Sequence, residues 1–255
     1  ADAAPMSAYV RHQFPFLGVK APARKAVVRT ALSAAGPPVD EVDVVDAVDR
    51  LWTLPEREYR YAGCLLADRF APAASPAFID HLSRWITADP WWDTCDPLAR
   101  GCTGKLVRRH PELRPTMDRW LSGDDLWLTR SALIHMGGWK HAIDREWVLE
   151  ACLARADHPD FFIRKAIGWI LRDLARAEPR AVVAFVEGKG ATVLSELSKR
   201  EALKNISLRP AGAAPTEPVP QGSDPCSARC VPTHKASRQR IGVYPPACAS
   251  DILDP

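Results

Sequence analysis

The sequence predicts an all-α protein organised as an α-solenoid, a superhelix of stacked helical pairs, and three observations carry this prediction. Residues 1–207 read as amphipathic helices of about ten to eighteen residues, separated by short breaks of Pro, Gly and Asp. No segment alternates polar and apolar residues with the period of two that a half-buried strand would show. A short arginine motif also recurs at the spacing of stacked helical repeats.

The breaks delimit the expected helices in order along the chain. Helices are expected over residues 21–36, 39–54, 55–70 and 75–87, and another begins near Pro90. Later ones contain "DDLWLTRSALIHM" and "FFIRKAIGWILRDLAR". The four helices at the start of this series follow one another closely, as in a chain of helical hairpins.

The arginine motif is the tripeptide Arg-x-Ala, which occurs at Arg60, Arg130, Arg164 and Arg200. Its later members are 34 and 36 positions apart, and the wider gap before Arg130 leaves room for one more, at Asp96. One interpretation is an arginine ladder that ties the repeats together, which we favour for Arg60, Arg164 and Arg200. An acid in a basic register instead marks Asp96 as a candidate for chemistry.

Composition divides the chain into two parts. All nine tryptophans precede residue 170, whereas residues 208–255 hold nine of the 23 prolines without a periodic apolar pattern. We therefore predict a folded domain over residues 1–207 and a disordered tail over 208–255. The tail contains Cys226, Cys230, His234 and Cys248, but their spacing matches no standard zinc module, so no metal site is expected.

Several broad classes are excluded or disfavoured. No apolar run reaches the roughly 18 residues of a membrane span, and no signal peptide is apparent, so we expect a cytoplasmic protein. Seven irregularly spaced cysteines disfavour a disulfide framework. Those in helical surroundings should be small buried apolar residues, namely Cys64, Cys95, Cys102 and Cys152. A net charge of +3 permits nucleic-acid binding without indicating it.

Arg130 lies in the middle of the apolar stripe of its helix when residues are placed about 100° apart. A guanidinium buried there needs an anionic partner. Two partners remain open, the carboxylate of Asp96 one repeat earlier or an external phosphate.

Trp169 points away from the apolar stripe of its helix, on a face that it shares with Lys165 and Arg172. One interpretation is a solvated face on which an aromatic platform among cations binds nucleic acid. The alternative is that a second layer of helices buries Trp169 as ordinary core.

The stretch "PWWDTCDP" places Trp92 and Asp96 four residues apart, on one face of the helix that begins there. Asp93 is expected to cap this helix. Pro97 is acceptable only in the first turn or at a kink, and it could re-aim Asp96 slightly.

With these residues in place, the chain resembles the bacterial DNA alkylation repair glycosylases of the AlkD type, which are built from HEAT-like helical repeats. The resemblance runs from about residue 8 to residue 206. The matching stretches are "FPFLGVKAPARK", "LWTLPEREYRYA", "WWDTCD", "RRHPEL", "WLSGDDLWLTRSA", "FFIRKAIGWILRDLA" and "LSKREALKNI". The chain departs from the family in Ala21, where a threonine is usual, and in its tail, and it starts where the family has a further helix before Ala1.

The resemblance implies an enzyme that hydrolyses the N-glycosidic bond of cationic alkylated purines in duplex DNA, with the lesion left stacked. Asp96 corresponds to the family's catalytic acid. Trp92 and Trp169 correspond to its lesion-contacting tryptophans, and Arg130 to its phosphate-contacting arginine. Tyr9 and Arg172 are expected near the DNA backbone, and Lys165 is added to them from its helical position.

The predicted function is therefore an alkylpurine DNA glycosylase of base excision repair that acts as a monomer on double-stranded DNA in the cytoplasm. No general acid is required, because the leaving base already carries a positive charge. No cofactor and no metal are expected. The rival prediction is a non-catalytic HEAT-repeat scaffold that binds DNA structures or a protein. Ion pairing of Asp96 away from a DNA-facing groove would favour that rival.

Overall fold

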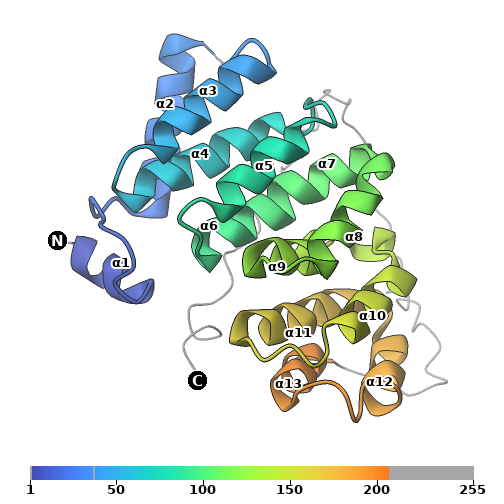
Figure 1. Cartoon of the computed structure of the whole chain (residues 1–255). Helices are drawn as coiled ribbons and strands as arrows, with labels where there is room; N and C mark the ends of the chain where they lie inside the picture. Colours follow the sequence, from blue (N-terminus) through green and yellow to red (C-terminus); the bar gives the residue numbers. More distant parts are fainter. Residues whose placement is uncertain (1, 37, 207–255) are drawn as a thin grey trace, which may run out of the picture. The chain divides into compact units, whose positions relative to one another are not determined.

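The computed structural model describes residues 2–36 and 38–206, in which all regular structure is helical (Figure 1). The all-α prediction is thereby confirmed, while the predicted tail over 208–255, with its cysteines and His234, lies outside the described residues. The α-helices are α1 (Ala3–Tyr9), α2 (Ala21–Ala35), α3 (Glu41–Trp52), α4 (Arg57–Phe70), α5 (Phe78–Thr87), α6 (Trp92–Pro97), α7 (Gly104–Arg109), α8 (Arg114–Ser122), α9 (Leu126–Ile134), α10 (Arg145–Ala154), α11 (Phe161–Ala175), α12 (Pro179–Glu187) and α13 (Glu196–Leu203).

From α3 onward, neighbouring helices form pairs that stack in sequence order. α3 packs on α4, α8 on α9, α10 on α11 and α12 on α13. The second helices of successive pairs also touch, so that α4 meets α6, α6 meets α9, α9 meets α11 and α11 meets α13. Figure 1 shows this succession from blue to orange. The predicted stack of helical pairs is the observed architecture.

Side-chain caps start many of these helices where the sequence breaks predicted. The side chains of Asp40, Asp125, Asp144 and Asp160 each accept a backbone N–H in the first turn of α3, α9, α10 and α11. Ser195 does the same for α13. Each cap satisfies a donor that the helix itself leaves free, and this fixes where the helix begins.

The helix that begins at Trp92 does not stay regular. α6 ends at Pro97, and a π-helical segment, Leu98–Thr103, joins it to α7. Pro97 has no N–H to donate to the preceding turn, and wider i→i+5 bonding follows it directly. The irregularity that was expected at Pro97 is therefore present, one residue after Asp96.

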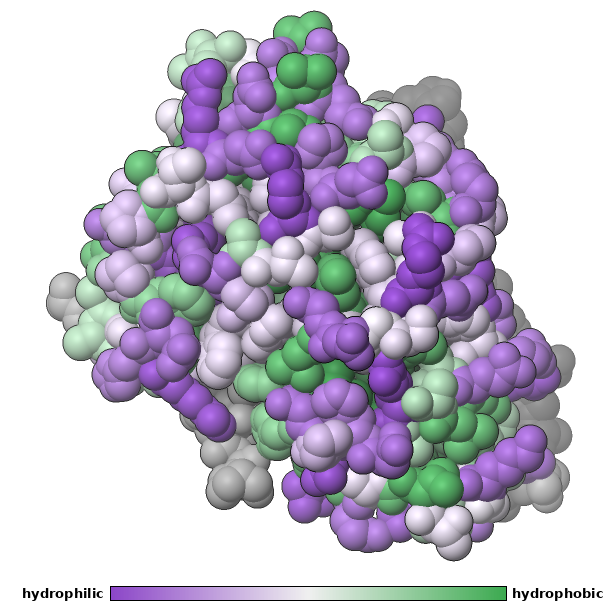
Figure 2. Space-filling model, in the orientation of Figure 1, coloured by the Kyte–Doolittle hydropathy of each residue, from purple (hydrophilic) through white to green (hydrophobic). Residues whose placement is uncertain are grey.

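The core runs along the stack and contains the four cysteines that the structure describes. Cys64, Cys95, Cys102 and Cys152 are free and buried, as predicted, and burial raises the pKa of Cys64 to about 12. Apolar exposure concentrates instead near α2 and α3, where Val27, Val39 and Val42 lie at the surface. Figure 2 shows this as green surface at the top of the view.

Buried ion pairs join successive repeats. Each pair spans a sequence separation of 34 or 36 residues, which is one repeat. The pairs are Arg57–Asp93, Asp96–Arg130 and Lys165–Glu201.

The predicted arginine ladder is confirmed only for Arg60, which pairs with Asp89 of the next repeat. Arg164 donates instead to the carbonyl of His158 in its own helical pair, and Arg200 is exposed. The ladder prediction is wrong for these two because the charges that link their repeats, Lys165 and Glu201, each lie one position after the repeated arginine.

Candidate active site

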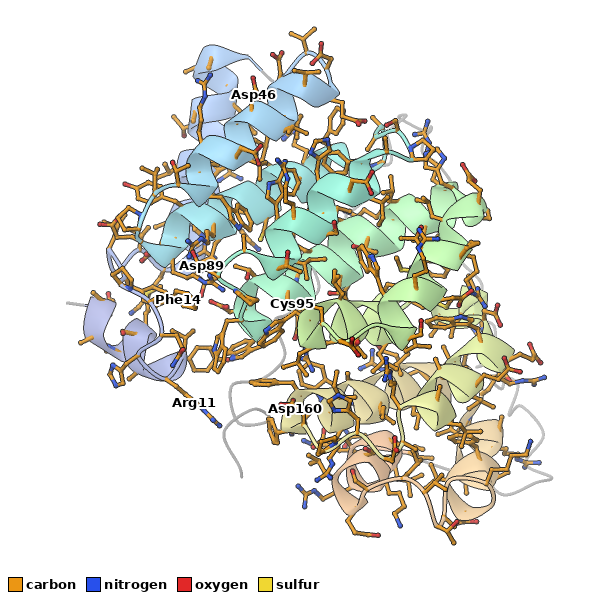
Figure 3. All side chains as sticks on the ribbon, viewed as in Figure 1. Arg11, Phe14, Asp46, Asp89, Cys95 and Asp160 are labelled. Carbon is orange, nitrogen blue, oxygen red and sulfur yellow. The ribbon has the colours of Figure 1, made fainter. Side chains whose placement is uncertain are left out.

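Asp96 lies in α6, a short helix fixed at both ends. Its first turn is closed by bonds from the N–H groups of Thr94 and Cys95 to the carbonyl of Trp91. The Cys95 sulfur lies 3.3 Å from the hydroxyl of Ser131, so the residue before Asp96 is packed directly on α9. Figure 3 labels Cys95 on α6 and Asp160 at the start of α11, the two helices on either side of α9.

The Asp96 carboxylate faces Arg130 of α9 in a bidentate pair. Arg130 Nε donates to Asp96 Oδ1 at 2.8 Å and Nη2 donates to Oδ2 at 2.8 Å. The remaining nitrogen, Nη1, donates to the carbonyl of Phe162 at 2.6 Å. Of the two partners that the sequence left open for Arg130, the structure shows the Asp96 carboxylate. Asp96 and the Phe162 carbonyl together occupy all three nitrogens of the guanidinium.

Burial separates the two members of this pair. Only 2% of the Arg130 side chain is exposed, against 15% of the Asp96 side chain. Burial by itself would lower the pKa of Arg130, but the Asp96 carboxylate outweighs burial, so the pKa of Arg130 is raised. The cation is thus fixed in place and the carboxylate retains access to solvent.

Trp169 of α11 packs against this cation. The Arg130 guanidinium lies 5.0 Å from the centre of the Trp169 ring, within cation–π range. Only 5% of Trp169 is exposed. The interpretation that Trp169 lies on a solvated face is therefore wrong, and the alternative that other helices bury it is confirmed. The reason is that Trp169 packs on Arg130 of the neighbouring helix α9.

Lys165 and Arg172 share one acidic partner from α13. Lys165 Nζ lies 3.0 Å from Glu201 Oε1, and Arg172 Nη1 lies 3.2 Å from Glu201 Oε2. Lys165 is 4% exposed, whereas 18% of the Arg172 side chain is exposed. The structure does not place Lys165 on an open surface, although the sequence placed it among DNA contacts.

Trp92 and Tyr9 bring the N-terminal helix to the site. Their ring centres are 5.2 Å apart in an edge-to-face arrangement. Burial raises the pKa of Tyr9, and the carboxylates of Asp93 and Asp96 raise it further. Tyr9 therefore lies close to Trp92 and Asp96. The sequence had placed Trp92 and Asp96 on one face of their helix, and it had not predicted a contact with Tyr9.

The expected capping role of Asp93 is wrong. The N-cap of α6 is Trp91, without a side-chain bond, and Asp93 instead pairs with Arg57 of α4. Arg57 Nε and Nη2 donate to its two oxygens at 3.0 and 2.7 Å, and the hydroxyl of Tyr61 donates to Oδ2. A buried guanidinium was the stronger competitor for this carboxylate.

Two contributors were missed from the sequence. Glu201 lies 36 residues after Lys165, so a search for opposite charges one repeat apart would have found it. Phe162 acts through its backbone carbonyl, which side-chain patterns do not report, and its ring packs against Trp91 and Trp127.

The described part of the chain offers no cluster of His, Cys, Asp and Glu suited to a metal ion. None of its helices combines the length and hydrophobicity of a membrane span.

The stack of helical pairs places the described chain among the helical-repeat proteins. Its candidate site combines the partly exposed Asp96 carboxylate with buried Arg130, with Trp92 on the same helix as Asp96 and Trp169 against Arg130. Residues 1–206 match the family described as "DNA alkylation repair enzyme", and the chain belongs to that family.

Solved structures agree with this assignment. A predicted DNA alkylation repair enzyme from Enterococcus faecalis is 28% identical with a TM-score of 0.74, and the match covers 81% of this chain and 95% of that one. AlkD2 from Streptococcus mutans is 16% identical with a TM-score of 0.59 over 80% and 99% of the two chains, and this likeness shows the fold alone. No curated protein matches the chain.

Proposed function

We propose that the chain is a DNA glycosylase that hydrolyses the N-glycosidic bond of cationic alkylated purines in duplex DNA, with N3-alkyladenine and N7-alkylguanine as substrates. One observation carries this proposal: the partly exposed Asp96 carboxylate is held by a bidentate pair with buried Arg130. Trp92 lies one turn away on the same helix, and Trp169 lies against Arg130. This is a fixed anion among aromatic rings.

A fixed anion suits the breaking of a bond to a base that is already positive. As the bond from C1′ to the base nitrogen breaks, its electron pair leaves with the base and neutralises the base. The sugar becomes oxocarbenium-like, and the Asp96 carboxylate stabilises that charge. A water positioned beside Asp96 adds to C1′, and the proton it loses passes to solvent. The base needs no general acid to depart.

The tryptophans supply selectivity for the charged lesion. An alkylated purine carries a positive charge that favours an electron-rich ring face by about 1–2 kcal/mol when partly desolvated. Trp92 is half-buried and can offer part of its ring, while Trp169 is 5% exposed and acts mainly by packing on Arg130. Uncharged purines gain less from either ring and also leave less readily.

The basic groups differ in their expected roles at the DNA backbone. Arg172 and Tyr9 are the candidates for contacts to the phosphate backbone because both keep some exposure. Lys165 is expected to act through Glu201 by keeping Arg172 in position. Arg130 contacts a phosphate only by releasing a present partner, so we assign it to orienting Asp96.

The rival function is a non-catalytic repeat scaffold, and the ion pair of Asp96 is the observation in its favour. Such a pair can exist for structure alone, as Arg57 and Asp93 illustrate. Exposure distinguishes the two cases, because the Asp93 side chain is 5% exposed and the Asp96 side chain is 15% exposed. Of these two carboxylates on α6, Asp96 is the more open to a bound substrate, and this favours the catalytic role for it.

The test is release of free bases from methylated duplex DNA, separated and identified by chromatography. The proposal expects N7-methylguanine and N3-methyladenine to appear with time in proportion to the amount of protein. A folded protein that binds this DNA and releases neither base would establish the scaffold instead.

A further inference from the structure

The segment before α2 forms an N-terminal arm, residues 2–20, that has little core of its own. α1 has seven residues and none of them is buried. A helix this short is marginal by itself, because isolated helices below about 12–15 residues rarely hold in water. Val10, just after α1, is fully buried, so the arm depends on contacts with the rest of the fold.

Glu58, in the first turn of α4, binds the backbone of the arm through its side-chain carboxylate. We call this contact the grip of Glu58. Its carboxylate accepts the N–H groups of Leu17 at 3.0 Å, Gly18 at 2.8 Å and Val19 at 2.9 Å. Glu58 is 4% exposed, and within residues 2–36 and 38–206 no ion pair involves it. A buried carboxylate is costly unless hydrogen bonds compensate it, and these three bonds provide the compensation.

Gly18 transmits this grip to α1. Its φ of +91° lies where residues with a side chain rarely go, and a Cβ added there would lie 2.8 Å from the backbone nitrogen of Ala3. The loop held by Glu58 is therefore in direct contact with the start of α1. A displacement of this loop must displace α1.

Arg57 connects the same turn of α4 to the site. Its backbone N–H donates to the carbonyl of Pro15 at 2.9 Å, and its guanidinium lies 3.7 Å from the ring centre of Phe14. That guanidinium is also the partner of Asp93 on α6. Figure 3 labels Phe14, a residue of the arm, near the start of α4.

The arm also reaches the site directly. The ring centre of Tyr9 lies 5.2 Å from that of Trp92 in an edge-to-face arrangement. We propose that Glu58 is a positioning residue that holds the arm in place so that Tyr9 fixes the ring of Trp92 beside Asp96. This inference rests on the proposed function, because a fixed Trp92 matters for a lesion stacked against it. Two neighbouring residues of α4 thus hold the two elements that we propose to meet at the lesion: Glu58 binds the arm, and Arg57 pairs with Asp93 of α6.

Glu58→Gln tests the grip without adding or removing bulk. The amide keeps one acceptor oxygen but turns a donor toward backbone N–H groups, so the arm should open more often. Trypsin should then cut after Arg11 or Lys20, both exposed, about tenfold faster in DNA-free protein. The control is Glu112→Gln, at a carboxylate whose side chain is 60% exposed, and it should leave this rate unchanged. An unchanged cleavage rate in Glu58→Gln would overturn the grip.

A double-mutant cycle on single-turnover base excision tests whether Glu58 acts through Tyr9. Glu58→Gln should slow excision about tenfold in the unaltered protein and less than about twofold in Tyr9→Ala, because linked residues are not additive. Additive effects, or normal excision with a loosened arm, would overturn the positioning role.

Gly18→Ala provides a second route if Glu58→Gln does not fold, because it loosens the arm from the opposite side. It should raise tryptic cleavage and slow excision in the same way, and failure of both effects would contradict the proposal. If the unaltered protein releases no base at all, the proposed function fails and the positioning role fails with it. The cleavage rates would still decide whether Glu58 holds the arm.

Discussion

Asp93 and Asp96 lie three positions apart on the same helix, and each forms a bidentate pair with a buried arginine. Their surroundings give them different roles. Asp93 also accepts the hydroxyl of Tyr61 and is almost closed to solvent, whereas Asp96 keeps part of its carboxylate open. At the scale of residues, access to water separates the structural acid from the one proposed for chemistry.

We predict that the protein loses stability in mild acid because His135 is buried in its neutral form. It is fully buried between Trp139 and Trp147, and burial lowers its pKa to about 4. The folded state therefore keeps the ring neutral, while the unfolded chain takes up a proton near pH 6.5. Its contribution is complete above pH 6.5 and is lost progressively as the pH falls toward 4, by on the order of 3 kcal/mol.

Urea unfolding at several pH values, for the unaltered protein and His135→Leu, measures this contribution. Between pH 6.5 and 4, the unfolding free energy of the unaltered protein should fall more steeply than that of His135→Leu, because only the unaltered protein has the buried imidazole. Parallel curves across that range would show that His135 is not the titrating group.

At the scale of elements, α9 is placed by its cap. The Asp125 carboxylate accepts the N–H groups of Trp127 at 2.9 Å and Leu128 at 2.8 Å, one turn before Arg130. Asp125→Ala should cost about 1 kcal/mol, which corresponds to roughly 2–4 °C in Tm for a domain of this size. The matched control is Asp124→Ala, which removes an exposed neighbouring acid that caps nothing. Equal Tm values for the two variants in thermal unfolding would refute the cap.

The contact of α11 with α13 has no spare room at Gly168. A Cβ there would lie 2.4 Å from the Cβ of Glu201 and 2.9 Å from the carbonyl of Ser198. Gly168→Ala should therefore separate the helices and loosen the bonds of Glu201 to Lys165 and Arg172, at a cost of about 1–3 kcal/mol. Chemical unfolding measures the cost, and a variant as stable as the parent would contradict such close packing.

At the scale of the whole described chain, stacked pairs make the architecture readable from sequence. Helical periodicity, breaks and a repeat of about 35 residues were sufficient to predict the all-α stack. The same register indicated Asp96 as one of two possible partners for the buried Arg130, beside an external phosphate, because the adjacent repeat places a carboxylate at that position. The structure shows the pair with Asp96. The contact of Trp92 with Tyr9 was not predicted, because the resemblance to a family gave each residue a role toward DNA and not a contact between them.

The features that could not be predicted from the sequence depend on which helices pack against one another. Helical angles placed Trp169 on one side with Lys165 and Arg172, but they could not report what lies against these residues. Glu201 of α13 pairs with Lys165 and Arg172. Trp169 packs on Arg130 of α9. Asp93 was taken for a cap because local preference is visible in sequence and the distant Arg57 is not. The contact of Glu58 with the arm could not be predicted from the sequence, because its partners are backbone N–H groups, which nearly every residue has.

The most direct test of the proposed chemistry is single-turnover excision from a duplex with one N7-methylguanine, comparing Asp96→Asn with Asp93→Asn. Each variant removes the charge from one carboxylate paired with a buried arginine, so both should lose stability. We predict that Asp96→Asn lowers the excision rate at least about 100-fold with little change in the Kd for DNA, and that Asp93→Asn, where folded, retains much more activity. Excision by Asp96→Asn at the parental rate would contradict the central role of this carboxylate.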